Sequence, residues 1–299
     1  MAKIVARIKG GLGNQLFCYA AARRLACATG AELVIDHVTG FARDRQYKRQ
    51  YMLDHFHISA RKATACERLE PFERYRRGVA KLISRQRPFL LRSYLEQEEE
   101  AFDPRLLALQ PSGTIYLDGL WQSERYFKDV EGTIRADLRI TPPEDPENQR
   151  MAAEMSACES VALHVRWFGA PGSGLSHNIS AGYYHGAVAA LEKRVDSPHY
   201  FLFSDDPEAA CAKLDLPAKR VTCVAHNRGD EHAYADLWLM TRCRHFIIAN
   251  STFSWWGAWL GAAEHKTVIA PEISLSGAMS WGFDGLIPEG WELLRVVSQ

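Results

Sequence analysis

Strand-like and helix-like patterns alternate along most of this chain, and this alternation limits the fold more than any other sequence feature. Short, mostly β-branched runs predict strands at 4–8, 33–36, 114–118, 161–165, 199–203 and 245–249. Helices are expected at 15–29, 183–194 and 232–243, after Asp206-Pro207, and from about Ser254. Alternation of this kind predicts parallel sheets covered by helices, which is the α/β class.

A proline-rich acidic stretch, Thr141–Pro146, is the best candidate for a linker. The strand–helix alternation restarts after it, and 299 residues suffice for two domains of about 150 residues. We therefore expect an amino-terminal domain at 1–140 and a carboxyl-terminal domain at 150–299, with a cleft between them.

Composition excludes several broad classes. The 36 basic and 36 acidic side chains give a formal charge of zero, which argues against nucleic acid as a partner. No stretch approaches the roughly 20 apolar residues of a membrane-spanning helix, and no signal peptide is visible. The seven cysteines are widely spaced without a C-x-x-C pair, so neither a disulfide framework nor a zinc site is expected. These features predict a cytoplasmic protein.

One segment, 61–92, departs from this neutral balance with ten Lys/Arg against three Glu. Its apolar side chains fall at helical spacing, and they are Phe72, Tyr75, Val79, Leu82 and Ile83. A basic amphipathic helix of this kind can lie on an anionic membrane, which suggests peripheral contact with the inner membrane face. The alternative is a solvated helix that docks by its apolar stripe. The acidic run Glu96–Glu100 that follows is expected to be a charged surface.

A glycine-rich turn, Gly10–Gln15, lies between the first expected strand and helix. Glycines there let backbone N–H groups approach a phosphate. Gly11 and Gly13 also match the start of the dinucleotide pattern G-x-G-x-x-G, and Asp36 stands where a ribose-binding acid would lie. Leu16 breaks that pattern, so an NAD-dependent oxidoreductase is only an alternative. A tight turn without a ligand is a further one.

Two other segments place polar groups after an expected strand. Asn250–Ser254 begins a helix, and its hydroxyl and N–H groups suit a pyrophosphate unless Ser251 or Ser254 simply caps the helix. Asp205 can accept hydrogen bonds from a nucleoside, whereas Asp206 before Pro207 is typical of a helix cap.

Arg166 follows the first strand of the second half, where ligands bind in open α/β sheets. Its guanidinium suits a phosphate, although a structural ion pair is the alternative. The chain has no D-x-D pair, the usual arrangement for holding a metal against a diphosphate, and no metal or other cofactor is expected.

Taken together, these segments resemble glycosyltransferase family 11, whose best-known members are α-1,2-fucosyltransferases. The matching segments are 10–17, 117–127, 203–208, 236–241 and 248–260. The resemblance implies a GT-B-like fold of two Rossmann-type domains, with acceptor-side contacts in the first and nucleotide-sugar contacts in the second. It also implies an inverting, metal-independent enzyme that moves fucose from GDP-fucose to a glycan hydroxyl, the 2-hydroxyl of a galactoside being expected.

The resemblance further implies roles for individual residues. Arg166 would contact the diphosphate and stabilise the departing charge, and Asp205 would hold the nucleoside. The remaining donor-binding residues are expected to be Gly11, Gly13, Asn14, His164, Asn250, Ser251, Thr252, Phe253 and Ser254. Asn14 is also expected to act in catalysis, because with Gly13 it would close over the transferred sugar and the acceptor.

One departure from the family pattern concerns the donor. The family usually has His-x-Arg-Arg-Gly-Asp, whereas this chain has Trp167 in place of the second arginine and Gly169 in place of the acid. Trp167 is expected to pack a loop, with stacking on a sugar or guanine as alternatives. Arg228 is a candidate substitute cation. The departure leaves open a different GDP-sugar donor, or a degenerate protein that binds a nucleotide sugar without turnover.

A general base would deprotonate the acceptor hydroxyl. Asp118, at the end of a first-half strand, is the predicted base. Asp36 and His37, at a neighbouring strand end, are the alternatives.

Overall fold

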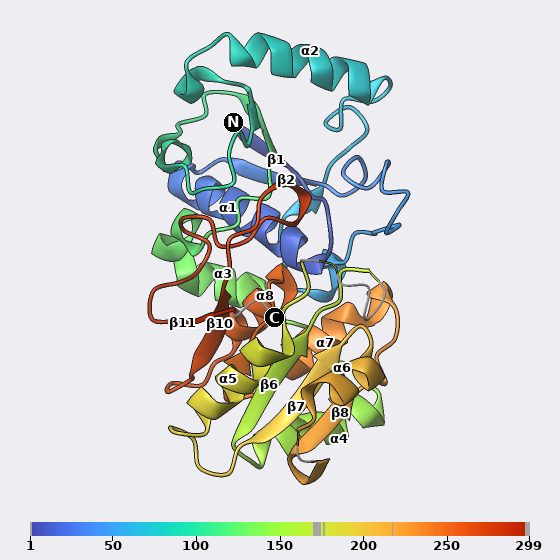
Figure 1. Cartoon of the computed structure of the whole chain (residues 1–299). Coiled ribbons are helices and arrows are strands. Elements are labelled where there is room, and N and C mark those ends of the chain that lie inside the picture. The colour runs from blue at the N-terminus through green and yellow to red at the C-terminus, as the bar shows by residue number, and fades with distance from the viewer. Residues whose placement is uncertain (1, 170–174, 176, 217, 297–299) are drawn as a thin grey trace. The chain divides into compact units, whose positions relative to one another are not determined.

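The computed structural model of the chain describes residues 2–169, 175, 177–216 and 218–296. Its contacts divide it into two α/β units (Figure 1). The first unit comprises the chain up to Thr141 together with Asp284–Leu286, and the second comprises the remainder. The returning segment differs from the boundary drawn from the sequence, and it is attached by the N–H of Phe102, which donates to the carbonyl of Asp284 at 3.2 Å.

The first unit is built on a five-stranded parallel sheet with strand order β3-β2-β1-β5-β4. Its strands are β1 (Lys3–Arg7), β2 (Glu32–Asp36), β3 (Arg61–Lys62), β4 (Tyr94–Glu96) and β5 (Thr114–Asp118). β1 lies at the centre, where Ile4 and Val5 are completely or almost completely buried. Because the strands are parallel, the carboxyl ends of β1, β5 and β4 lie side by side at one edge of the sheet.

Its helices are α1 (Leu12–Thr29), α2 (Glu73–Arg85) and α3 (Glu131–Asp137), with short 3-10 helices at Leu53–His55, Phe89–Leu91, Pro104–Ala108, Glu124–Tyr126 and Lys128–Val130. Gly30 ends α1 in a left-handed conformation with φ of 67°, and its N–H donates to the carbonyl of Ala26. α1 begins three residues earlier than predicted. α2 is the helix expected in the basic segment, and Ser84 is its one buried residue.

The second unit contains a six-stranded parallel sheet with strand order β11-β10-β9-β6-β7-β8. Its strands are β6 (Ser160–Val165), β7 (His199–Ser204), β8 (Val221–Val224), β9 (His245–Ile247), β10 (Val268–Glu272) and β11 (Glu292–Arg295). Together with the first sheet, this confirms the predicted α/β class with parallel strands.

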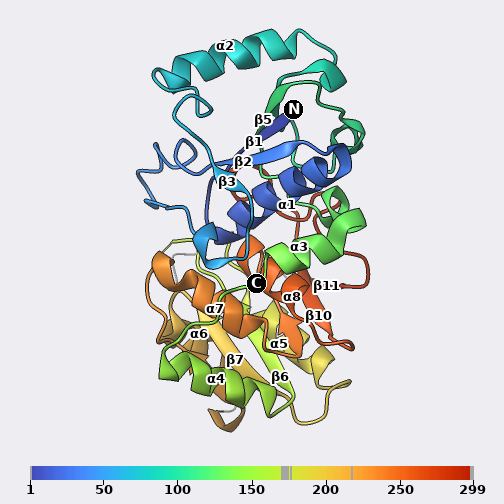
Figure 2. The same cartoon turned by 180° about the vertical axis from the view of Figure 1, so that it is seen from behind.

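The helices of the second unit are α4 (Pro146–Ser156), α5 (Ala181–Leu191), α6 (Pro207–Leu214), α7 (Ala233–Met240) and α8 (Thr252–Leu260), with 3-10 helices at Ala218–Arg220, Asp230–His232 and Gly277–Met279. Side chains of α5 and α6 pack with Val161 and Leu163 of β6 in one apolar core. The alternate residue His164 faces the other side of the sheet, where it meets Ser254 of α8. Figure 2 shows α4 and α7 in front of this sheet.

Helix starts follow the local signals in the sequence. Asp206 caps α6 by accepting the N–H of Ala209, with Pro207 at the first helical position, as predicted. Asp145 caps α4 in the same way, so the proline-rich segment predicted as a linker runs directly into a helix. In the described part of the chain, no helix is both long enough and apolar enough to cross a membrane.

Candidate active site

In the second unit, polar side chains gather at the carboxyl ends of three neighbouring strands. β6 lies between β9 and β7 in the sheet. His164 and Arg166 come from the end of β6, Asp205 follows β7, and Asn250 follows β9. Because parallel strands end at the same edge, these four side chains, predicted from positions far apart in the sequence, lie along one edge.

Arg166 and Asp205 form an ion pair at this edge. Arg166 Nη1 lies 2.6 Å from Asp205 Oδ2, and the two side chains remain 29% and 33% exposed. Asp205 Oδ1 also accepts the N–H of Trp167 at 3.0 Å. Partial burial raises the pKa of Asp205, and Arg166 opposes that rise. The structural ion pair considered from the sequence is therefore present, and it leaves the guanidinium partly open to solvent.

Trp167, which replaces the arginine of the family pattern, packs in the apolar core and is only 6% exposed. Its predicted packing role is confirmed. Lys213 of α6 lies over the indole ring, with Nζ 4.5 Å from the ring centroid, and burial lowers the pKa of this lysine. Gly169 follows with φ of 109°, and the loop at 170–174, where no charged side chain occurs, lies outside the described residues.

His164 is buried between β6 and α8. Its Nδ1 lies 2.9 Å from Ser254 Oγ, and its ring centroid lies 5.7 Å from that of Phe253. Burial, reinforced by the nearby charge of Arg166, lowers the pKa of His164 to about 3. The imidazole is therefore neutral at pH 7, and it positions the first turn of α8 rather than supplying charge.

The amino terminus of α8 completes this edge. Ser251 occupies the N-cap position with an extended backbone and makes no side-chain capping hydrogen bond to the helix. The first-turn N–H groups, beginning with Thr252 and Phe253, carry the positive end of the helix dipole. Nearby, Asn250 Nδ2 donates to the carbonyl of His177 at 3.0 Å, whereas its buried Oδ1 has no partner within the described part of the chain. This end of the sheet is suited to an anionic ligand.

The glycine-rich turn of the first unit connects β1 to α1. Gly10 has φ of 77°, and Gly11 occupies the N-cap position. Because α1 begins at Leu12, Gly13 and Asn14 lie in its first turn rather than before it. Asn14 Oδ1 accepts a hydrogen bond from Gln122 at 2.8 Å, which links the turn to the segment after β5.

Gln15 holds this turn in place, a role that the sequence did not reveal. Its buried side chain donates to the carbonyls of Gly10 at 3.0 Å and Gln50 at 2.8 Å, and it accepts the N–H of Met52. The adjacent loop, which includes Tyr47, is thereby attached to the start of α1.

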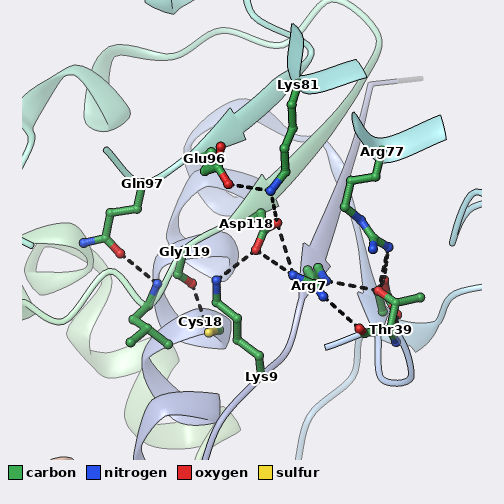
Figure 3. A network of polar contacts seen from close by, with 12 residues as sticks. Arg7, Lys9, Cys18, Thr39, Arg77, Lys81, Glu96, Gln97, Asp118 and Gly119 are labelled. Carbon is green, nitrogen blue, oxygen red and sulfur yellow. Dashed lines mark hydrogen bonds and ion pairs between the residues drawn. The ribbon is translucent and has the colours of Figure 1, made fainter. Parts of the chain in front are cut away.

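Asp118 is the centre of a polar network at the end of β5 (Figure 3). The carboxylate is only 2% exposed, and it lies 2.9 Å from Lys9 Nζ, 3.2 Å from Arg7 Nη1 and 3.3 Å from Lys81 Nζ. The hydroxyl of Tyr94 donates to it at 2.8 Å. Although burial favours the protonated form, Lys9 and Arg7 hold the pKa of Asp118 far below its usual range.

This environment bears on the predicted role of Asp118 as base. A carboxylate stabilised by three cations takes up a proton reluctantly. The alternatives at β2 are also engaged: Asp36 accepts the N–H of Thr39 at 2.9 Å and lies 3.7 Å from Arg77. The ring of His37 packs edge-on against Tyr51. Which of them acts as base stays a prediction.

Two adjoining cavities of about 540 and 620 Å³ lie beside this network in the first unit. The smaller is lined by Lys9, Asp118, Gly119, Leu120 and the run Glu96–Glu100. The larger is lined by Lys9, Gly10, Asn14, Gly40, residues 43–47 and Leu120. Lys9 and Leu120 belong to both. The acidic run, expected to be a plain charged surface, is thus part of a cavity wall.

Three residues of the Asp118 network and the cavity wall were missed from the sequence. Lys9 stands between β1 and the glycine turn, and its place at a strand end was the available signal. Lys81 and Glu96 form an ion pair with each other, and Lys81 also reaches Asp118. No local pattern shows such pairing, because the partners are far apart in the sequence.

The network around Asp118 predicts that neutralising this carboxylate strongly destabilises the fold. Asp118→Asn is expected to lower the unfolding free energy by about 2–4 kcal/mol at neutral pH, because Arg7, Lys9 and Lys81 lose their shared anion. Since the pKa of Asp118 is lower in the folded state, its stabilisation is complete above the ordinary value of about 3.9 and is lost as the pH falls below that value. Urea unfolding from neutral to acid pH measures both effects.

Asp129→Asn is the matched control, because Asp129 pairs with Arg24 in the same unit but is 54% exposed. This substitution is expected to lower the free energy of unfolding by less than about 1 kcal/mol. Equal costs for the two variants would contradict the assignment of Asp118 as a buried anchor.

The lowered pKa of His164 predicts a second effect of pH on stability. Because its pKa is lower in the folded state, the protein must lose stability as the pH falls from about 6.5, by about 2 kcal/mol at pH about 5. His164→Gln, which cannot be charged, should lack this slope in urea unfolding. The exposed His232, changed to Gln, should retain it. A parallel pH profile for wild type and His164→Gln would show that the imidazole does not resist protonation.

Comparison with known proteins agrees with this architecture. The chain is 28% identical over 281 residues to an α-1,2-colitosyltransferase of Escherichia coli, covering 91% of this chain and 92% of the relative. It is 26% identical over 288 residues to the O-antigen biosynthesis glycosyltransferase WbnK of Escherichia coli, covering 90% and 94%.

Two solved structures share the fold at low sequence identity. NodZ α-1,6-fucosyltransferase, soaked with GDP-fucose, aligns with a TM-score of 0.52 and 18% identity over 87% of this chain and 92% of that chain. A mutant of Arabidopsis thaliana FUT1 in complex with GDP aligns with a TM-score of 0.54 and 12% identity over 93% and 71%. These matches confirm the GT-B-like α/β fold.

The family comparison covers almost the whole chain. The model of glycosyl transferase family 11 matches residues 3–291, which include the glycine turn, the end of β5 and the edge formed by β6, β7 and α8. This match excludes the oxidoreductase alternative, which depended on two glycines and one acid. The chain belongs to glycosyltransferase family 11.

Proposed function

We propose that this glycosyltransferase moves fucose from GDP-fucose to a glycan hydroxyl, with the 2-hydroxyl of a galactoside as acceptor. The family supports the reaction class, and the relative named as an α-1,2-colitosyltransferase supports the linkage. The solved structures that contain GDP-fucose or GDP support the nucleotide.

The observation that carries the donor proposal is the edge formed by Arg166 and the start of α8. A partly exposed guanidinium and first-turn N–H groups supply positive charge in one unit, and His164 adds none because it is neutral. We infer that the GDP diphosphate binds here, between Arg166 and residues 251–254. Asn250 Oδ1 is available to accept a hydrogen bond from the bound ligand.

In the proposed reaction, an acceptor hydroxyl attacks the anomeric carbon on the face opposite GDP. The new C–O bond forms as the bond between that carbon and the diphosphate oxygen breaks, and GDP departs with the electron pair. Arg166 and the α8 terminus stabilise the charge that develops on the diphosphate. The hydroxyl proton passes to a base, and the configuration at the anomeric carbon is inverted.

The acceptor is proposed to occupy the cavities of the first unit. Their walls combine the ammonium of Lys9, the carboxylates of the Glu96–Glu100 run and Asn14. Such groups bind neutral sugars by hydrogen bonds to ring hydroxyls. Asn14, held by Gln122, is proposed to orient a hydroxyl near the glycine turn.

A second donor is also proposed, because Trp167 replaces an arginine of the family pattern and one relative is named as an α-1,2-colitosyltransferase. A GDP-linked colitose is therefore the alternative donor. Because of the same replacement, a further alternative is that the protein binds the donor without transferring its sugar. Transfer assays with both donors, with product linkage determined, distinguish all three outcomes.

The donor proposal predicts that GDP raises the melting temperature of the wild-type protein. Arg166→Ala is expected to weaken GDP binding by more than about twentyfold, because a charge-assisted contact to phosphate is lost. Isothermal titration calorimetry with GDP measures the change. Arg194→Ala is the control, since Arg194 also forms an ion pair, with Glu292, in the second unit. Equal affinity of Arg166→Ala and wild type would contradict the proposed phosphate site.

The base proposal has its own test. If Asp118 is the base, Asp118→Asn should lower kcat by about 10²–10⁴-fold. Its low pKa also predicts that wild-type kcat/KM stays level down to about pH 4, because the carboxylate remains ionised. Asp36→Asn is the matched variant at the neighbouring strand end. Full activity of a folded Asp118→Asn protein would transfer the role elsewhere.

A further inference from the structure

Helix α2 is attached to the first unit by its polar face, the reverse of the usual arrangement. Arg77 donates to Thr39 Oγ1 at 2.7 Å, and Lys81 pairs with Glu96 and Asp118. The buried hydroxyl of Ser84 accepts the N–H of Tyr94 at 2.9 Å. These positions, spaced four and three residues apart, share one helix face.

The opposite face of α2 is apolar and exposed. Phe72 is 77% exposed, Tyr75 is 75% exposed and Leu82 is 64% exposed. The same stripe and the segment after it add Val79, Ile83, Leu90 and Leu91. A helix of a soluble protein normally turns such a stripe toward the core. An exposed patch of this kind marks an interaction surface.

The backbone at the start of the helix also presents an aromatic ring to solvent. Phe72 immediately precedes α2 with φ of 65°, a left-handed conformation that is unfavourable for a bulky residue. Strain of this kind persists where surrounding structure enforces it, and it is concentrated at functional positions. The ring gains no burial within the protein in return.

Exposed positive charge lies near both ends of this helix. Arg74, Arg76 and Arg87 are exposed, and none of them forms an ion pair with a described residue. Arg76 donates to the backbone carbonyls of Leu69 and Glu70, at 3.3 and 3.1 Å. The surface therefore combines large apolar side chains with unneutralised cations.

We propose that the apolar face of α2, with Arg74, Arg76 and Arg87, docks on an anionic lipid bilayer. Aromatic and aliphatic side chains enter the boundary between headgroups and acyl chains, while guanidinium groups contact lipid phosphates. A second copy of the chain fits this surface less well. Pairing two such faces would bury the apolar stripes but bring their arginines together, whereas an anionic membrane satisfies both features.

Docking by α2 would act next to the proposed acceptor cavity. Lys81 joins the inner face of α2 to Glu96 and Asp118, which line that cavity. An acceptor glycan anchored in the same bilayer would then be held near its site. This last step rests on the proposed function, whereas the membrane contact does not.

The test is co-flotation of the full chain with two kinds of vesicle, one of phosphatidylcholine alone and one that also contains phosphatidylglycerol. Strong binding is expected only to the anionic vesicles, and added salt should weaken it. Changing Arg74, Arg76 and Arg87 to Glu should reduce binding by about a hundredfold or more. Changing Tyr75, Leu82 and Ile83 to Ser should reduce it roughly tenfold for each side chain.

Matched controls are charge reversals at Lys193, Lys219 and Arg295, which are exposed in the second unit, and Leu293→Ser, an exposed apolar residue there. These should bind as wild type does. Urea unfolding reports the fold of every variant, and GDP affinity tests the donor site separately. Vesicle binding unaffected by the α2 variants would overturn the proposal. So would dimerisation in vesicle-free solution that the Tyr75, Leu82 and Ile83 changes abolish, measured by analytical ultracentrifugation.

Discussion

Asp118 is a buried carboxylate, and such a group is stable in the charged form only with cations or hydrogen-bond donors around it. In this protein the cations are Arg7 of β1, Lys9 of the turn after β1, and Lys81 of α2. Because Lys81 faces inward, the polar face of α2 lies against the unit and its apolar face is left outside. The contacts of Asp118 thus help to form a cavity wall and to decide which face of α2 is exposed.

The second unit handles charge differently. There the carboxylate of Asp205 and the guanidinium of Arg166 remain partly exposed, and the buried His164 beside them is kept neutral. Positive potential is therefore supplied by an accessible guanidinium and by backbone dipoles at the start of α8. This arrangement suits a ligand that binds and is then released. Binding a diphosphate would rearrange one surface ion pair, and it would leave no buried charge unpaired.

Much of this architecture could be predicted from the sequence, because strand periodicity, glycine turns and capping residues are local signals. β5 has the predicted bounds, Gly30 ends α1, and Asp206 caps α6. The orientation of α2 could not be predicted, since periodicity identifies two helix faces without saying which is buried. Contacts such as Arg7 with Asp118, 111 residues apart, depend on the assembled sheet. The roles of the site residues came from residue chemistry and from the family resemblance, and they stay predictions.

Lys213 gives the replacement of an arginine by Trp167 a chemical consequence. The indole ring occupies the core, yet an ammonium group lies over it, so the neighbourhood keeps a cation of another kind. A guanidinium stays protonated at every pH that a protein survives, whereas an ammonium with a lowered pKa is titratable in alkaline solution. The positive charge that Lys213 adds beside Trp167 would therefore decrease in alkaline solution, whereas the charge of an arginine at position 167 would not.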